Sequence, residues 1–353
     1  MLYVGLTNVL FVLRYALARQ GALRKQLYFL VLTALFVFSA FRYQVGCDWS
    51  GYYYQYLGAR NFEWSSVTEI REPIWWAILG WIQSMGLPYP VVNIASSAIF
   101  FLGIHALARR QPDPLGFLVL LFPILIINLP MSGVRQGAAI GLICIAFAAF
   151  IDRRPLWYAF WVVVAAGFHS SALIFMLLLP VATGRYSRGR LLLAAILAVP
   201  GAFFLASGDA ADVATSRYVG TGVDAAGAMF RVGILGLSAL YFFMFLSKKW
   251  QRTWPNDYSL ASIGAIGMAL TLLLVPVSTV IGDRFGYYLI PIQAMIFARI
   301  PFLPFRANAA LHAALPYLGL LLVFTVWSQL SWHFEQCYIP YQSCLDSNIK
   351  CNG

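Results

Sequence analysis

Ionisable residues that stand against long apolar runs are the part of this chain most able to do chemistry, because charge at membrane depth is costly and usually functional. They are Arg42, Asp48, Glu72, Arg135, His169, Asp283 and Arg284. Arginine is the side chain best suited to bidentate recognition of phosphate, and carboxylates and histidine are common general bases. Their combination favours chemistry on a phosphorylated substrate.

Two of the arginines open apolar runs. In residues 132–136, backbone N–H groups at a helix start and the Arg135 guanidinium would together form a cradle for phosphate. Residues 283–288 open a second run with Asp283 and Arg284. Two arginines at helix starts suit a diphosphate, with Arg42 as a third candidate ligand. The structural alternative for each is an arginine that snorkels to lipid headgroups.

The candidates for a general base are Glu72, Asp48 and His169. Glu72 precedes Pro73 at a predicted helix start, and Asp48 follows a glycine-containing turn. His169 lies at the Gly167 to Ser171 break between two apolar runs. The carboxylates could equally serve as helix-start charges, and the histidine could be structural.

Composition determines the class of protein. Only 10% of the residues are charged and 61% are apolar, with a mean hydropathy of +0.75, whereas soluble domains have about 25% charged residues. The sequence therefore predicts an all-α, polytopic membrane protein. No hydrophilic stretch is long enough for a separate folded unit, so we expect residues 1–353 to form a single integral membrane domain.

The net charge of +11 comes from short basic clusters between apolar runs, which is the pattern of cytoplasmic loops rather than of nucleic-acid binding. The clusters contain Arg19, Arg24, Lys25, Arg109, Arg110, Arg153, Arg154, Arg185, Arg188, Arg190, Lys248, Lys249, Arg252, Arg299 and Arg306. The segments left outside are 42–71, 130–135, 207–228, 281–284 and the tail 331–353. All candidate site residues are then predicted to face away from the cytoplasm.

This topology predicts roughly 10–12 transmembrane helices, given the ~20 residues that a span needs. The crossings fall near 2–18, 26–41, 90–108, 115–129, 134–151, 190–206, 229–247, 259–281, 285–299 and 308–328. Residues 73–85 are expected to be a short re-entrant or interfacial piece. Residues 155–184 are too few for two full spans at ~1.5 Å rise per residue, so we expect a hairpin of half-helices that turns near His169. Broken helices are tolerated at membrane depth only where they line a buried or wet cavity. The outer loop 42–71 is expected to hold an amphipathic helix on the membrane surface, since Trp49, Tyr52, Tyr53 and Tyr56 recur at helical spacing.

The cysteines give an independent prediction. Cys47, Cys337, Cys344 and Cys351 fall in the predicted outer segments, where an oxidising compartment permits disulfides. Four cysteines allow three connectivities, and we expect at least one bridge, such as one that ties the tail to the loop holding Asp48. No metal site is expected, because the outer acidic residues are separated and no histidine has a second one at ligand spacing.

The order of these motifs resembles the EpsG family of bacterial exopolysaccharide proteins, a branch of the Wzy-type polysaccharide polymerases. The motifs, which cover nearly the whole chain, are Arg42…Gly46…Asp48…Tyr52, Glu72-Pro73, Arg135-Gln136, 168–172, 283–288 and 338–343. Cys47 departs from the family pattern in a minor way, because a small polar residue is more usual there.

The resemblance implies a metal-independent glycosyltransferase of GT-C-like architecture that needs no cofactor and works on the periplasmic face of the inner membrane. It would join oligosaccharide units carried on undecaprenyl diphosphate, which serve as both donor and acceptor. In this interpretation, Arg135, Arg284 and Arg42 hold the leaving diphosphate, and Glu72, Asp48 or His169 is the base. Sugar or lipid contacts would come from Asp283, Gln136, Tyr52, Tyr56 and Tyr287.

Membrane lipid surrounds such a protein, and a chain-length regulator and a flippase are partners expected from the resemblance. Three other functions stay open. A membrane acyltransferase would also use a histidine, but the sequence has no second histidine or acidic partner arranged beside His169. A flippase for lipid-linked oligosaccharides would also carry buried charges, but such transporters usually place them near the midplane within repeats. An O-antigen ligase would share the donor and differ in the acceptor.

Overall fold

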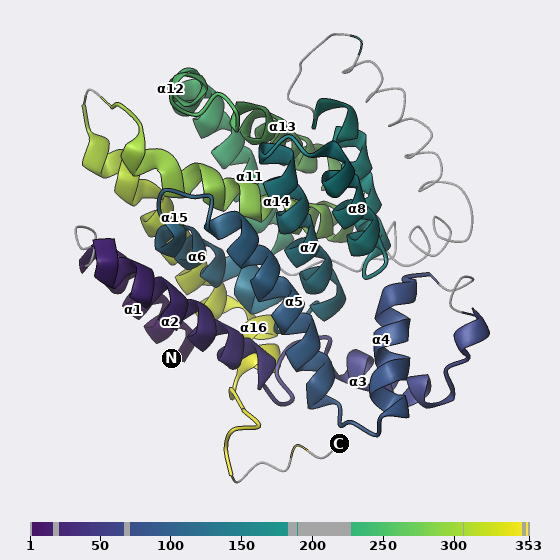
Figure 1. Ribbon diagram of the computed structural model, residues 1–353. Coiled ribbons are helices and arrows are strands. Elements are labelled where there is room, and N and C mark those ends of the chain that lie inside the picture. Colours follow the sequence, from purple (N-terminus) through teal and green to yellow (C-terminus); the bar gives the residue numbers. More distant parts are fainter. Residues whose placement is uncertain are drawn as a thin grey trace. The chain divides into compact units, whose positions relative to one another are not determined.

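The computed structural model describes residues 2–16, 21–66, 71–182, 189, 227–305, 307–347 and 351. These residues form helices joined by short loops, with one isolated β-bridge between Arg42 and Ser343 and no strand among them (Figure 1). The predicted all-α class is therefore confirmed. The predicted crossing at 190–206, the outer segment 207–226 and the basic positions 19, 185, 188, 190 and 306 lie outside the described residues.

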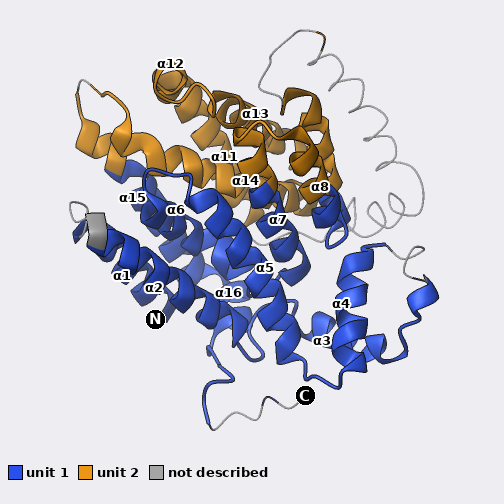
Figure 2. Cartoon of the chain, in the orientation of Figure 1, with its two compact units in different colours: residues 1–145, 163–172, 314–353 blue, residues 146–162, 173–313 orange. Residues whose placement is uncertain are grey.

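The chain forms two compact units (Figure 2). The first consists of residues 1–145, 163–172 and 314–353, and the second of residues 146–162 and 173–313. The expectation of a single membrane domain stays a prediction.

In the first unit, α2 packs against α5 and α6, and the two shorter helices α3 and α4 pack on one another and, through α4, on α5. The elements wholly within this unit are α1 (Leu2–Ala16), α2 (Gly21–Ala40), α3 (Trp49–Gly58), η1 (Ala59–Asn61), η2 (Trp64–Ser66), α4 (Pro73–Ser84), α5 (Pro90–Ala108), α6 (Pro114–Leu121), the π-helical segment η3 (Phe122–Ile126) and α16 (Trp332–Tyr338).

In the second unit, α11, α13 and α14 pack against one another. Its elements are α11 (Ala228–Tyr241), the π-helical segment η5 (Phe242–Leu246), α12 (Ser247–Thr253), α13 (Tyr258–Leu274), α14 (Thr279–Arg299) and η6 (Ile300–Phe302). Four further elements begin in one unit and end in the other: α7 (Val134–Ile151), α8 (Pro155–Ala166), η4 (Ser170–Val181) and α15 (Ala309–Leu330).

Five helices in the described residues are long and apolar enough to cross a membrane. They cover Leu23–Ala40, Pro90–Ala108, Val134–Ile151, Ala228–Thr253 and Ala309–Leu330. Shorter apolar helices accompany them, so the chain is a multi-pass membrane protein, while the total of 10–12 crossings stays a prediction. The spans differ in how much of each is buried inside the protein. The buried share is 22% for α15 and 83% for α7. A span shielded from lipid is suited to carry polar groups, so α7 is the better candidate.

The short elements lie where broken helices were expected. α4 begins at Pro73, whose missing N–H costs nothing at a first helical position. α8 has 12 residues and rises only ~18 Å, less than the ~30 Å of hydrocarbon, before the chain turns into η4. The predicted pair of short helices around residues 167–169 is therefore confirmed as local structure, as is the helix in the outer loop, α3.

Candidate functional site

The centre of the site in the first unit is an ion pair between Glu72 and Arg135. Glu72 is the N-cap of α4, and Arg135 is the second residue of α7. Arg135 Nη1 lies 2.5 Å from Glu72 Oε2, with side-chain exposures of 28% and 9%. The fold thus joins a carboxylate and a cation 63 residues apart in the sequence.

Glu72 is held in place from two sides. Its backbone is left-handed, with φ at 66°, a conformation that costs ~1 kcal/mol or more in a residue with a side chain. Its second carboxylate oxygen, Oε1, accepts a hydrogen bond of 3.2 Å from the Ser170 N–H. Both oxygens of Glu72 are therefore engaged by protein donors.

The loop that holds His169 is fastened to the start of α4. The Gly167 carbonyl accepts hydrogen bonds from the N–H groups of Ile74 and Trp75, at 3.0 and 3.1 Å. A Cβ on Gly167 would lie 2.5 Å from the Ile74 side chain, so this close approach requires glycine. His169 Nδ1 and Ser171 Oγ are 2.7 Å apart, which fixes the imidazole. His169 is thereby placed one residue from the Ser170 N–H that binds Glu72.

Arg71 is a further member of this group that the sequence interpretation did not single out. Its Nε and Nη2 donate to Ser170 Oγ at 3.0 and 2.9 Å, so it braces the same loop from the exposed side. Its position directly before Glu72-Pro73 was the available signal.

Tyr52 covers the other face of Arg135. The guanidinium carbon lies 5.7 Å from the centre of the Tyr52 ring, within the range of a cation–π contact. Burial raises the pKa of the Tyr52 hydroxyl, which therefore stays protonated near neutral pH. Arg135 Nε is buried and has no hydrogen-bond partner in the described part of the chain. A buried, unpartnered cationic N–H is unfavourable unless a ligand accepts from it.

The contacts of Arg42 differ from those expected of a diphosphate ligand. It is 1% exposed, and each of its three nitrogens donates to the protein: Nε to the carbonyls of Val45 and Met131, Nη1 to that of Ser39, and Nη2 to Asn93 Oδ1. This arrangement is structural, because the guanidinium ties the end of α2 to the loop before α7.

Gly46 allows that arrangement. Its φ of +107° is disfavoured for residues with a side chain, and a Cβ there would lie 1.9 Å from the Met131 carbonyl oxygen. The same carbonyl accepts from Arg42 at 2.8 Å. The Gly46 turn therefore sets the position of the next two residues, Cys47 and Asp48.

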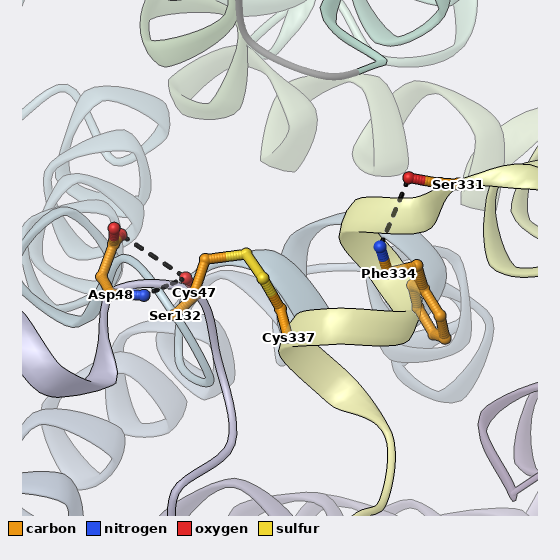
Figure 3. The surroundings of a disulfide bond; sticks show 6 residues. All are labelled: Cys47, Asp48, Ser132, Ser331, Phe334 and Cys337. Atoms are coloured by element: carbon orange, nitrogen blue, oxygen red, sulfur yellow. Dashed lines mark hydrogen bonds between the residues drawn. A yellow bond between two sulfur atoms is a disulfide. The ribbon is translucent and has the colours of Figure 1, made fainter.

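Asp48 is linked to the start of α7 and to the C-terminal segment (Figure 3). Its N–H donates to Ser132 Oγ at 3.3 Å, and the same hydroxyl lies 3.4 Å from Asp48 Oδ2. The neighbouring Cys47 forms a disulfide with Cys337 of α16, which confirms the expected bridge between the tail and this loop. A second disulfide joins Cys344 and Cys351.

Tyr56 and Gln136 are the two other predicted sugar or lipid contacts in the first unit. The Tyr56 hydroxyl donates to the Leu87 carbonyl at 2.7 Å, which joins α3 to the loop after α4. Gln136 is buried next to Arg135 in α7. Their sugar-binding roles stay predictions.

Asp283, Arg284 and Tyr287 belong to the second unit, within α14. That helix begins at Thr279, capped by Ser278, so the expectation that residues 283 and 284 open it was wrong by a turn. Asp283 accepts two hydrogen bonds from the Arg231 guanidinium of α11, at 2.7 and 2.8 Å. The Arg231 guanidinium also lies 5.6 Å from the Tyr287 ring centre. Arg284 is exposed.

The described residues contain no group of three or more His, Cys, Asp or Glu side chains that could hold a metal ion.

Comparison with known proteins identifies the family. The family model described as the EpsG family matches residues 25–343, a stretch that contains every residue of the Glu72–Arg135 group. No curated protein and no solved structure matches the chain. The match confirms the resemblance seen in the sequence motifs, and we conclude that the chain belongs to the EpsG family.

Proposed function

We propose that this EpsG-family protein is a polysaccharide polymerase that joins oligosaccharide units carried on a polyprenyl diphosphate, and that Arg135 binds the departing diphosphate. Membership of the family supports a polymerase-like role in exopolysaccharide synthesis. The observation that carries the assignment is Arg135 itself, whose guanidinium is fixed by Glu72 and whose buried Nε makes no hydrogen bond within the described residues.

The bond changes define what the site must supply. A hydroxyl at the non-reducing end of one lipid-linked unit attacks the anomeric carbon of the growing chain. The bond between that carbon and the diphosphate oxygen breaks, so negative charge collects on the lipid diphosphate. Arg135 and the N-terminal N–H groups of α7 would neutralise this charge, and preorganised donors of this kind are often the largest contribution to catalysis.

We assign the general base to His169. The proton of the attacking hydroxyl must leave as the new bond forms, and the imidazole is oriented for this by the contact of its Nδ1 with Ser171 Oγ. Glu72 then has a positioning role, since both of its oxygens are already bound to Arg135 and Ser170. Asp48 is exposed and contacts Ser132, which suits it to hold α3 against the start of α7.

The remaining features of the proposal come from the sequence. They are an active site on the periplasmic face of the inner membrane, undecaprenyl diphosphate as the carrier and independence of metal ions. No step of the proposed reaction is assigned to Asp283, Arg284 or Tyr287, and their ligand roles stay predictions.

The test is elongation by the purified protein in nanodiscs, supplied with the lipid-diphosphate-linked repeat unit and EDTA. The proposal predicts a ladder of chain lengths on a gel from the wild type and from Lys248→Ala, which alters an exposed cation elsewhere, and no ladder from Arg135→Ala. Absence of polymer from folded wild-type protein, together with movement of the lipid between leaflets, would replace the polymerase with the transporter. Transfer of single units to an unrelated acceptor would favour the ligase.

A further inference from the structure

A small pocket in the first unit lies beside α3 and is distinct from the Glu72–Arg135 group. It has a volume of about 140 Å³ and is lined by Tyr43, Gln44, Trp49, Tyr53, Tyr89 and Cys351, among others. Tyr43 and Gln44 are held in place by the C-terminal segment, because the Tyr43 N–H donates to the Gln342 carbonyl at 2.9 Å. The Cys344–Cys351 disulfide closes the segment that brings Cys351 to the pocket.

The walls of the pocket are aromatic rings in a fixed arrangement. Trp49 and Tyr53, one turn apart on α3, are stacked at 5.2 Å and 9°. Tyr89 stands edge-on to both, at 5.8 Å from Trp49 and 5.4 Å from Tyr53. Tyr43 meets Trp49 edge-on at 6.1 Å. Such rings offer electron-rich faces, to which the C–H bonds of a sugar ring are attracted.

Two donors on the walls of the pocket are buried. The Tyr89 hydroxyl and the Trp49 indole N–H are both buried and make no hydrogen bond within the described residues. Tyr89 as a whole is only 3% exposed. Buried polar groups are normally satisfied, and two unsatisfied ones on adjacent walls of a pocket are what a ligand rich in hydroxyl groups would satisfy. A hydrocarbon tail would leave both unsatisfied.

The volume sets the size of the ligand. A cavity of ~150 Å³ accommodates one benzene-sized ring, so this pocket is suited to a single six-membered ring and not to a disaccharide. The mixture of ring faces, phenol hydroxyls and the Gln44 amide is typical of sites that fix the orientation of a small polar ligand.

The pocket and the ion pair share a helix. α3 rises only ~15 Å over its 10 residues. Trp49 and Tyr53 of this helix line the pocket, while Tyr52, between them in sequence, faces Arg135. A sugar in the pocket would therefore belong to the same substrate chain that reacts beside Arg135.

We propose that this aromatic pocket is a subsite for one pyranose ring of the glycan, stacked against Trp49 or Tyr53 and hydrogen-bonded by Tyr89 and the Trp49 indole. The proposal rests on the proposed function for the identity of the glycan. It gives the EpsG-family protein a means to select the repeat unit that is separate from recognition of the diphosphate.

The test is direct binding of the lipid-free repeat-unit oligosaccharide, released by mild acid, to the full-length protein in nanodiscs, followed by saturation-transfer NMR. Tyr89→Phe should weaken binding about 2- to 10-fold, the value of one hydrogen bond. Trp49→Ala should weaken it about 10- to 100-fold, the value of one stacked ring and its donor. Tyr54→Phe is the matched control, because Tyr54 lies on the same helix but is exposed and outside the pocket.

Tyr89→Phe keeps the test independent of folding, since it removes a hydroxyl that makes no hydrogen bond in the described part of the chain and should leave the thermal-unfolding midpoint unchanged or higher. Wild-type affinity in both Trp49→Ala and Tyr89→Phe overturns the subsite. The sugar subsite is also overturned if undecaprenol shows saturation transfer with the wild type and loses it with Trp49→Ala, because the pocket would then bind lipid. Elongation is measured on the same samples: polymer without Trp49-dependent sugar binding refutes only the subsite, and sugar binding without polymer refutes only the polymerase.

Discussion

The substitution Glu72→Gln separates a positioning role from a base role. Glutamine keeps the shape and one acceptor oxygen, which can bind the Ser170 N–H or Arg135 but not both, and it removes the charge that holds Arg135. Two unit charges ~4 Å apart near a protein surface attract by about 4 kcal/mol at an effective dielectric constant of 20. The Arg135 side chain is 28% exposed, so solvent screening reduces this attraction. We expect a cost of ~1–2 kcal/mol, which is about a 5- to 30-fold fall in kcat.

The double variant gives the sharper result. Removal of an oxyanion-binding donor typically costs ~10²- to 10³-fold in kcat, and this is the fall expected for Arg135→Ala. If Glu72 acts only through Arg135, Glu72→Gln adds almost nothing in the Arg135→Ala background, because the group it positions is gone.

The assay is single-turnover elongation in nanodiscs, with thermal unfolding as a check of folding. Glu63→Gln, the same chemical change at an exposed carboxylate of the same loop, is the control and should have wild-type turnover. Two results together would refute the positioning role and make Glu72 the base. They are a fall in kcat of ~10²-fold or more in Glu72→Gln, and a fall in the double variant equal to the product of the two single-variant falls.

Further predictions concern stability and cofactors. Gly46→Ala should lower the free energy of unfolding by at least ~3 kcal/mol, because its Cβ would meet the Met131 carbonyl oxygen at 1.9 Å in a left-handed backbone; an unchanged unfolding midpoint would contradict this packing. Cys47→Ser should cost ~2–4 kcal/mol, and treatment of the wild type with a reductant should cost at least as much, because it also breaks the Cys344–Cys351 bridge. Asp283→Asn should cost ~3 kcal/mol by leaving Arg231 without its carboxylate, and a melting curve like that of the wild type would exclude the pair. Elongation should be equal with and without EDTA, whereas loss in EDTA that Mg²⁺ restores would refute metal independence.

Much of the helical framework could be predicted from the sequence, because apolar length and basic loops are local signals. Pro73 after Glu72 marked the start of α4, and the break at Gly167 marked the turn between α8 and η4. The sequence predicts too late a start for α14, because the Ser278 hydroxyl caps the helix ahead of the charged pair Asp283-Arg284. The charges alone did not reveal the cap.

The pairing of site residues could not be predicted, because it depends on contacts between distant segments. Nothing local to Glu72 indicates that it meets Arg135, and nothing local to Asp283 indicates Arg231. Arg42 had the same sequence signature as Arg135, but the close approach of Gly46 to Met131 gathers carbonyls around it and makes it structural. A charge beside an apolar run therefore indicates that the position is constrained. Only the three-dimensional contacts distinguish an arginine with a donor left for substrate from one whose nitrogens all bind the protein.

The central claim is that a glycosidic bond forms as a diphosphate leaves beside Arg135. The most direct measurement is the amount of polyprenyl diphosphate released per glycosidic bond formed, followed on the same nanodisc sample for the wild type and Arg135→Ala. We expect one diphosphate per bond in the wild type and a ~10²- to 10³-fold slower appearance of both in Arg135→Ala. Bond formation without release of diphosphate, or release at the wild-type rate in Arg135→Ala, would contradict it.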